Sequence, residues 1–195
     1  DFSLLVTDAE RKGDDRPFVR LQPRRHTSTA DHWWTIDGIL LHRRHPSCLF
    51  GMGNVGKSYL ALYLAGCLAR QGVPVLYLDW ELAQADHEER LAQLFESEWS
   101  EWPLTYTECH GSSILDQRDR IKAHIRRDQI GYVVVDSIVK AAEGDVNDAE
   151  TAKLYIRAID SWGVPSLHVA HTVKPNLTVK LDPYRQTIFG STFWD

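Results

Sequence analysis

The feature that most constrains this chain is an eight-residue pattern, GxxxxGK[ST], at residues 51–58. A short apolar run at 47–50 precedes it, and apolar residues at helical spacing follow it over 57–71. This setting predicts a strand, a glycine-rich turn and a helix in direct succession. The N–H groups of such a turn and the positive end of its helix bind phosphate. The sequence therefore predicts a phosphate-binding loop (P-loop) at 51–58.

The side chains of this loop predict a site for a nucleoside triphosphate and Mg²⁺. Lys57 can reach the β and γ phosphates, and the Ser58 hydroxyl can ligate the metal. Three glycines, Gly51, Gly53 and Gly56, permit positive φ and close approach of the backbone to a ligand. We expect ATP to contact the loop and the residue after it, namely Gly51, Met52, Gly53, Asn54, Val55, Gly56, Lys57, Ser58 and Tyr59.

The remaining hydrophobic pattern predicts an α/β fold. Apolar runs of strand length alternate with helical patterns, which is typical of a mostly parallel, twisted sheet with helices on both faces. The expected strands are 47–50, 73–79, 132–136 and 165–170, and the expected helices are 57–71, 86–97, 116–127 and 148–162.

Length and composition predict one globular domain. The 195 residues, 43% of them hydrophobic, are enough for one sizeable core. Residues 1–32 lack periodicity and are expected to form an irregular leader or docking arm, and 33–195 to form the ATPase domain. Because the chain starts without Met and stops within an apolar run at 193–195, we expect a piece of a longer protein, truncated at its C-terminus.

Charge and cysteine content exclude several classes of function. A net charge of −5 argues against a nucleic-acid grip spread over the whole surface, although it leaves room for a local basic channel. The three scattered cysteines fit neither a disulfide framework nor a zinc site. The sequence also lacks a signal peptide and a membrane span. We therefore expect a cytoplasmic protein that does not bind a membrane.

Asp136 is the second candidate for the site. It ends the apolar run 132–135, where a carboxylate is costly unless it emerges at the ligand-binding edge of the sheet. Parallel strands bring their carboxyl ends together, so Asp136 is expected to hold Mg²⁺ or its bound water beside Ser58. The alternative is that Asp136 caps the next turn.

Two carboxylates, Asp79 and Glu81, close the predicted strand 73–79. Hydrolysis needs a group that orients and partly deprotonates the attacking water, and a glutamate one strand from the P-loop is well placed for this role. We expect Glu81 to be that catalytic group and Asp79 to bond loop backbone. The alternative for Glu81 is a structural charge at a helix N-terminus.

Two histidines belong to the last predicted strand. His171 lies at its carboxyl edge and is expected to join Lys57 and Glu81 as a catalytic residue that senses the γ-phosphate. A purely structural His171 stays the alternative. His168 alternates with apolar neighbours and is expected to be a core histidine with satisfied hydrogen bonds.

In their order and spacing, these motifs resemble those of RecA-fold P-loop ATPases, most closely the RepA-like replicative DNA helicases. The resemblance covers about residues 33–194. It is carried by segments 34–40, 51–58, 78–81, 136–137, 144–149, 170–174 and 189–192.

The resemblance implies a homo-oligomeric ring, usually of six subunits, with ATP at each interface and single-stranded DNA in the pore. It assigns phosphate binding to Lys57 and Ser58, water activation to Glu81 and magnesium support to Asp136. His171 would relay the nucleotide state towards DNA.

The end of the chain departs from the family pattern. An arginine finger often lies near the Gly-Ser pair at 190–191, yet Phe189 precedes it, so Arg185 or a residue beyond 195 would have to serve. Segment 172–188 holds Lys174, Lys180 and Arg185. It is either a pore loop that contacts phosphates or simply a solvated loop.

Three functions fit this pattern. The first is an ATP-driven helicase or translocase acting on single-stranded DNA. The second is a RecA-fold regulatory or signalling ATPase that acts on protein partners without nucleic acid, which the acidic balance favours. The third, a small-molecule kinase, fits least, because residues 140–160 are acidic and helical rather than an arginine-rich lid.

Overall fold

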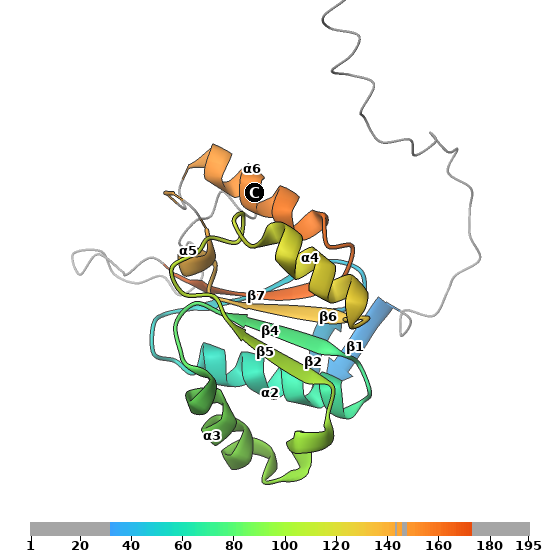
Figure 1. The fold of residues 1–195 in the computed structure, drawn as a ribbon. Helices are drawn as coiled ribbons and strands as arrows, with labels where there is room; N and C mark the ends of the chain where they lie inside the picture. Colours follow the sequence, from blue (N-terminus) through green and yellow to red (C-terminus); the bar gives the residue numbers. More distant parts are fainter. Residues whose placement is uncertain (1–31, 143, 146–147, 173–195) are drawn as a thin grey trace, which may run out of the picture.

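The computed structural model describes residues 32–142, 144–145 and 148–172. They form one five-stranded sheet covered by helices on both faces, with a two-stranded hairpin beside it (Figure 1). The elements in chain order are β1 (Trp33–Ile36), β2 (Ile39–His42), β3 (Ser47–Gly51), α2 (Lys57–Arg70), β4 (Val75–Asp79), α3 (Gln84–Phe95), η2 (Glu98–Glu101), β5 (Leu104–Glu108), α4 (Arg118–Arg127), β6 (Tyr132–Asp136), α5 (Ile138–Ala141), α6 (Ala149–Asp160) and β7 (Ser166–His171).

The strands of the main sheet run in the order β3-β7-β6-β4-β5, and every neighbouring pair is parallel. The expected α/β fold with a parallel sheet is confirmed. Parallel pairing places all carboxyl ends at one edge of the sheet. In register, His171 lies beside Gly51, and Asp136 lies beside Asp79. This edge is where the predicted site residues meet.

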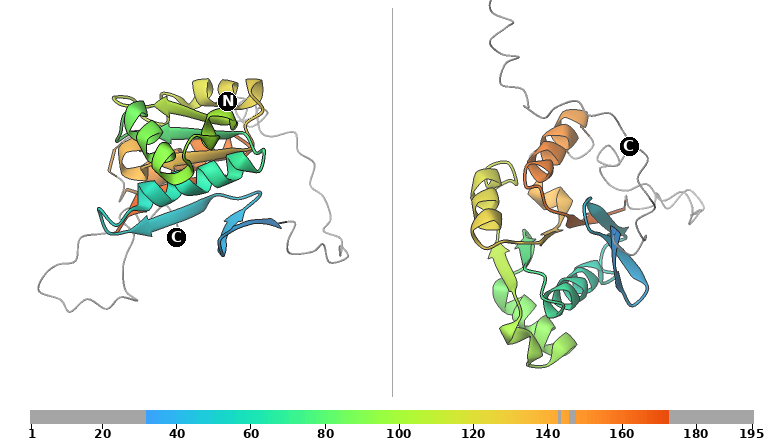
Figure 2. Two further views of the ribbon diagram at one scale, coloured as in Figure 1. Left: turned by 90° about the horizontal axis from the view of Figure 1, so that it is seen from below. Right: turned by 90° about the vertical axis from the view of Figure 1, so that its right-hand side faces the viewer.

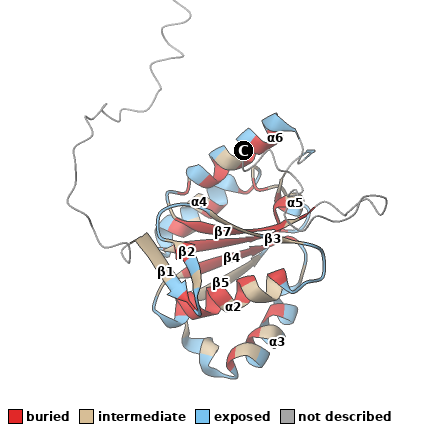
Figure 3. Cartoon of the chain, turned by 180° about the vertical axis from the view of Figure 1, so that it is seen from behind, coloured by how far each residue is buried: buried red, intermediate tan, exposed pale blue. Residues whose placement is uncertain are grey.

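Two hydrophobic cores fill the spaces on either side of the sheet. In β4, Val75 and Tyr77 face α2 and α3, while Leu76 and Leu78 face α4, α5 and α6. This alternation follows from the two-residue period of a strand. The central strands are buried throughout, and the helices keep exposed outer faces (Figure 3). Burial on both faces explains why these strands are continuous apolar runs.

The hairpin β1–β2 turns at Asp37 and Gly38, which both have positive φ. Such a two-residue turn matches the right-handed twist of the strands that it joins. The ring of Trp34 packs edge-on against that of Tyr132, the first residue of β6. The hairpin therefore covers the amino ends of the strands, away from the edge with the predicted site, and Figure 2 shows it beside the sheet.

Some elements differ from the sequence predictions. The hairpin, β5 and the short helix α5 were not predicted. Strand β4 starts at Val75 rather than 73, because Pro74 has no N–H for the ladder and instead accepts hydrogen bonds at its carbonyl. The proposed leader at 1–32 lies outside the described residues except for residue 32. Within the described ranges, no helix is long and apolar enough to cross a membrane.

Helices α2 and α3 pack together at Gly66, a buried glycine in the middle of α2. A Cβ at this position would lie 2.4 Å from the ring of Phe95. That ring stacks on Tyr63 and meets Trp102 edge-on, so its freedom to move aside is small. Gly66 is therefore required by close packing rather than by backbone conformation.

Replacing Gly66 by alanine is expected to destabilise the protein by about 1–3 kcal/mol through overpacking. Alanine normally stabilises a helix interior by about 1 kcal/mol relative to glycine, so the expected sign is the reverse of the helix propensity. Chemical denaturation measures the change. In a Phe95→Leu background, which relieves the clash, the same substitution should cost less. A Gly66→Ala protein as stable as the parent would contradict this packing.

Candidate active site

The P-loop connects β3 to α2 and opens away from the sheet. In this loop, Asn54 and Gly56, the N-cap of α2, have positive φ, whereas Gly51 and Gly53 do not. Of the three glycines that could adopt positive φ, Gly56 does so. A Cβ at Gly53 would meet no atom within 4 Å, so packing inside the described chain does not explain this glycine. The face of the loop at Gly53 is open to a ligand.

The start of α2 is suited to an anion. No side chain among the described residues caps it, whereas Asp148 caps α6 by accepting a hydrogen bond from the Thr151 N–H. The first N–H groups of an uncapped helix need acceptors, and phosphate oxygens are good ones. The P-loop and the first turn of α2 therefore present one continuous set of donors.

Lys57 is buried at the inner side of this loop. Its Nζ donates to the Met52 carbonyl at 2.6 Å and lies 3.3 Å from Nδ1 of His171. Burial lowers the pKa of the Lys57 ammonium, and the carboxylates of Asp136 and Glu81 act in the opposite direction. The structure thus places the one lysine of the motif between the loop backbone and two acidic side chains.

Tyr59 lies outside this arrangement. Its hydroxyl donates to Oε1 of Gln93 on α3 at 2.9 Å, and its ring lies near the Arg90 guanidinium. The Tyr59 side chain is therefore directed to the neighbouring helix.

Asp136 ends β6 and is 2% exposed. Its Oδ2 accepts a hydrogen bond from the Tyr77 hydroxyl at 2.8 Å, while the buried Oδ1 has no hydrogen-bond partner among the described residues. Burial raises the pKa of Asp136 to about 6, and the Tyr77 and Ser58 hydroxyls counteract that rise. Because an unpaired buried oxygen is costly, Oδ1 is suited to a ligand that comes from outside the chain.

A magnesium ion fits the chemistry of these groups. Mg²⁺ prefers oxygen ligands and usually keeps several waters, so that one or two protein groups suffice. Ser58 and Asp136 supply two such oxygens close together. The described residues contain no group of three or more His, Cys, Asp or Glu side chains arranged to hold a metal without such help.

Glu81 lies in the loop that follows β4. Its Oε1 accepts a hydrogen bond from Ser137 Oγ at 2.6 Å and lies 3.8 Å from Nε2 of His171. The prediction that Glu81 lies one strand from the P-loop is wrong for the sheet order, because β7 and β6 separate β4 from β3. The loop after β4 and the intervening strand ends nevertheless bring Glu81 close to the residues of the P-loop.

His171 joins these groups because β7 lies between β3 and β6. Lysine can only donate, so the contact with Lys57 is a hydrogen bond when Nδ1 of His171 is the acceptor. Nε2 is the nitrogen that faces Glu81. The His171 ring therefore lies between Lys57 and the candidate catalytic carboxylate of Glu81.

His168 is a core histidine, as predicted. It is fully buried, with Nδ1 bonded to the Tyr155 hydroxyl and Nε2 to Ser166 Oγ, both at 2.7 Å. Burial lowers its pKa to about 3. His168 thus stays neutral and structural.

Asp79 is also structural in its contacts. It is completely buried, its Oδ1 accepts hydrogen bonds from the N–H groups of Glu81 and Leu82, and its Oδ2 pairs with Nε2 of His87. The prediction that Asp79 bonds loop backbone is confirmed. The sequence did not indicate that Tyr77 would bond to Asp136, Ser137 to Glu81 or His87 to Asp79.

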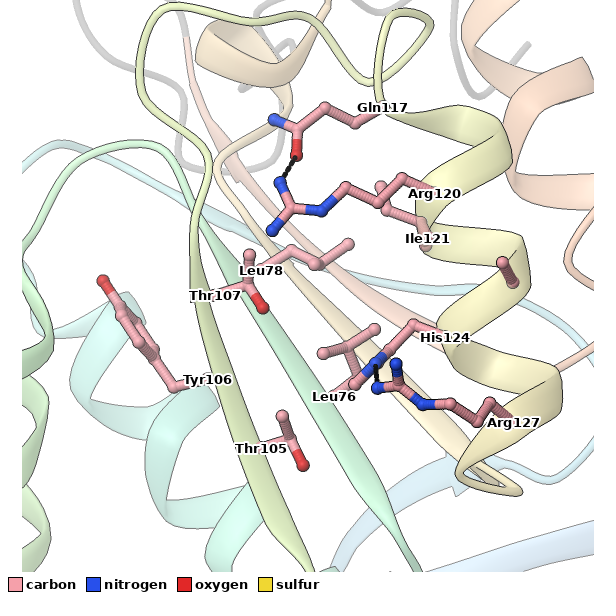
Figure 4. A pocket seen from close by; sticks show the side chains of 11 residues that line it. Leu76, Leu78, Thr105, Tyr106, Thr107, Gln117, Arg120, Ile121, His124 and Arg127 are labelled. Atoms are coloured by element: carbon pink, nitrogen blue, oxygen red, sulfur yellow. Dashed lines mark hydrogen bonds between the residues drawn. The ribbon is translucent and has the colours of Figure 1, made fainter.

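A pocket of about 640 Å³ lies elsewhere, between α4 and the strands β4 and β5 (Figure 4). Figure 4 shows Arg120, His124 and Arg127 of α4 along one side and the two threonines of β5 opposite. None of the residues predicted for the site lines it. This pocket is therefore separate from the candidate site.

Several predicted residues lie outside the described part of the chain. They are Lys174, Lys180, Arg185, Phe189, Gly190 and Ser191. Arg185, one of the two candidates for the arginine finger, and most of the expected pore loop 172–188 belong to this segment.

Comparison with known proteins identifies the family. Residues 18–176 match the model of a family described as "AAA domain", and the chain belongs to that family. A solved structure of an ATPase domain from another protein is similar to this fold with a TM-score of 0.56. It is 15% identical over 70% of this chain and 63% of that chain, so this likeness concerns the fold, and the match spans less than two thirds of that chain. No curated protein matches the sequence.

The family and the fold together define a P-loop ATPase domain with a RecA-like core, as expected from the sequence. Membership of this family implies that the chain binds a nucleotide.

The Tyr77–Asp136 hydrogen bond gives a direct test of the site geometry. Tyr77→Phe leaves the buried Asp136 carboxyl without its donor, and the expected loss of stability is about 1–3 kcal/mol, measured by denaturation. In an Asp136→Asn background the loss should shrink, because the charge that needs the donor is gone. Equal losses in both backgrounds would show that the hydroxyl stabilises the protein independently of Asp136.

Proposed function

We propose that this chain hydrolyses ATP in a magnesium-dependent reaction and couples hydrolysis to movement along single-stranded DNA. The proposal of ATP hydrolysis rests on one observation: polar side chains converge at the carboxyl edge of the sheet, next to the P-loop. These are Lys57, Glu81, Asp136 and His171. Four polar groups, from the start of α2, the loop after β4 and the ends of β6 and β7, would not gather there for packing alone, because burying polar groups costs desolvation.

Each residue has a distinct proposed task. The N–H groups of the P-loop and Lys57 bind the phosphates, and the Ser58 hydroxyl and Asp136 hold Mg²⁺, which neutralises phosphate charge when bound. Glu81 accepts the Ser137 hydrogen bond with one oxygen and keeps the other to orient a water for attack on the γ-phosphate. His171, between Lys57 and Glu81, transmits the state of the nucleotide to the segment after β7.

The coupling to DNA rests on the resemblance to RepA-like helicases and on topology. The carboxyl edge of the sheet continues from His171 directly into segment 172–188, which carries Lys174, Lys180 and Arg185. In a ring of identical subunits, this segment would supply several copies of each cation to one phosphate backbone. We propose a hexameric ring, with the arginine finger contributed by Arg185 or by a residue after 195.

A second function, regulation of protein partners by a RecA-fold ATPase that does not bind nucleic acid, is favoured by the net charge of −5. Protein-directed ATPases do not need a basic channel, whereas a DNA translocase does. The two functions share the same hydrolytic site and differ in what the segment after β7 contacts.

Two substitutions test the hydrolytic site. Glu81→Gln should bind ATP normally and lower the turnover rate about 10²–10⁴-fold, which is the usual contribution of a general base. Lys57→Ala should lose ATP binding itself. Equilibrium binding and steady-state hydrolysis separate the two effects, and Glu89→Gln, an exposed glutamate on α3, is the control. Normal turnover in Glu81→Gln would remove Glu81 from the mechanism.

Single-stranded DNA separates the two proposed functions. A DNA translocase should hydrolyse ATP several-fold faster with a saturating single-stranded oligonucleotide than without it, and the increase should fall with rising salt because phosphate contacts release counterions. A chain that neither binds the oligonucleotide nor changes its rate would exclude the translocase and leave the protein-directed ATPase. Release of free phosphate, rather than its transfer to an acceptor, excludes a kinase in the same assay.

A further inference from the structure

The loop 80–83, which carries Glu81 between β4 and α3, makes several hydrogen bonds to neighbouring parts of the protein. The Trp80 N–H donates to the Asp136 carbonyl at 2.8 Å, and the Trp80 ring N–H donates to the Ser112 carbonyl at 2.7 Å. The next two N–H groups both donate to Asp79. Backbone groups in a connecting loop usually bond to water, so this loop has exchanged solvent for protein partners.

Tyr106 holds the far end of the loop. Its hydroxyl donates to the Leu82 carbonyl at 2.7 Å. Tyr106 belongs to β5, which pairs with β4 so that Tyr106 lies beside Tyr77. Burial raises the pKa of Tyr106, which keeps its hydroxyl protonated and therefore a donor. The edge strand β5 is thus hydrogen-bonded, through the Tyr106 side chain, to the loop that follows its neighbour β4.

His87 connects the same loop to α3. It is 2% exposed, pairs through Nε2 with Asp79, and packs between the rings of Tyr77 and Tyr106, each 4.9 Å away. Asp79 is thereby shared: one oxygen holds the loop and the other holds the helix that follows it. The first turns of α3 cannot shift without disturbing the residue that fixes the Glu81 backbone.

We propose that Asp79, His87 and Tyr106 are positioning residues for Glu81, and that they act by locking the loop 80–83. This inference rests on the proposed role of Glu81 in orienting water. The Glu81 side chain itself is about one third exposed. Within the described residues, its one short hydrogen bond is to Ser137, so its direction also depends on its backbone. A displacement of about 1 Å at a catalytic group can lower a rate about 10²-fold. A loop that holds the Glu81 backbone in place would therefore keep the hydrolysis rate high.

Tyr106→Phe is the sharpest probe because it removes one oxygen and keeps the ring. We expect kcat for ATP to fall about five- to tenfold through misplacement of Glu81, while KM and equilibrium ATP binding stay unchanged. Tyr63→Phe is the matched control, since it removes a tyrosine hydroxyl that bonds to Asp37 in the hairpin turn rather than to the loop. An unchanged kcat in Tyr106→Phe would overturn the proposal.

A double-mutant cycle separates positioning from a general structural effect. In a Glu81→Gln background, Tyr106→Phe should cause no further loss of single-turnover rate, because the group that it positions is already disabled. An equal fold-loss in both backgrounds would show that Tyr106 acts independently of Glu81 and would overturn the proposal. Glu81→Gln alone reports on the proposed function: if it turns over normally, that function fails, whatever Tyr106→Phe does.

His87 provides a second, independent variant in case Tyr106→Phe disturbs folding. His87→Gln keeps a side chain that can donate to Asp79, whereas His87→Ala does not. We expect His87→Ala to lower kcat more than His87→Gln does, with ATP affinity retained in both. Equal rates in the two variants would exclude the Asp79–His87 contact as a positioning interaction.

Discussion

The parallel register of β3, β7, β6 and β4 is the constraint on which the candidate site depends. Parallel pairing places Gly51 beside His171 and Asp136 beside Asp79, so residues that are far apart in the chain end at one edge. Loops can then add groups to that edge without moving the strands. This arrangement explains how polar residues from four separate segments gather around the P-loop.

The two buried aspartates at this edge show how the chain balances desolvation against function. Asp79 uses both oxygens inside the protein, on loop N–H groups and on His87, so its burial is compensated. Asp136 receives Tyr77 on one oxygen and keeps the other without a hydrogen-bond partner among the described residues. This difference is a physical reason to assign the structural task to Asp79 and the metal to Asp136, and it is independent of any family resemblance.

The sequence predicted the central strands because their burial on both faces leaves a continuous apolar run. The sequence predicted the short outer strands less well, because their hydrophobic patterns extend over only a few residues. Asp37-Gly38 between Trp34-Thr35-Ile36 and Ile39-Leu40-Leu41 indicates a hairpin, and Leu104-Thr105-Tyr106-Thr107 has the alternation of an edge strand, yet neither element was predicted. The contacts made by Tyr77, Ser137 and Tyr106 could not be predicted, because they depend on the lateral strand order, which the order along the chain does not reveal.

We propose that the strand ends around the P-loop form one site that binds ATP with magnesium and aims Glu81 at the γ-phosphate. An experimental structure with a non-hydrolysable ATP analogue and Mg²⁺ is the decisive test. We expect the phosphates in the loop 51–58, Mg²⁺ between Ser58 and Oδ1 of Asp136, and the Glu81 carboxylate one water away from the γ-phosphate. A nucleotide bound in the pocket between α4 and β5, or a Glu81 side chain turned away from the phosphates, would contradict it.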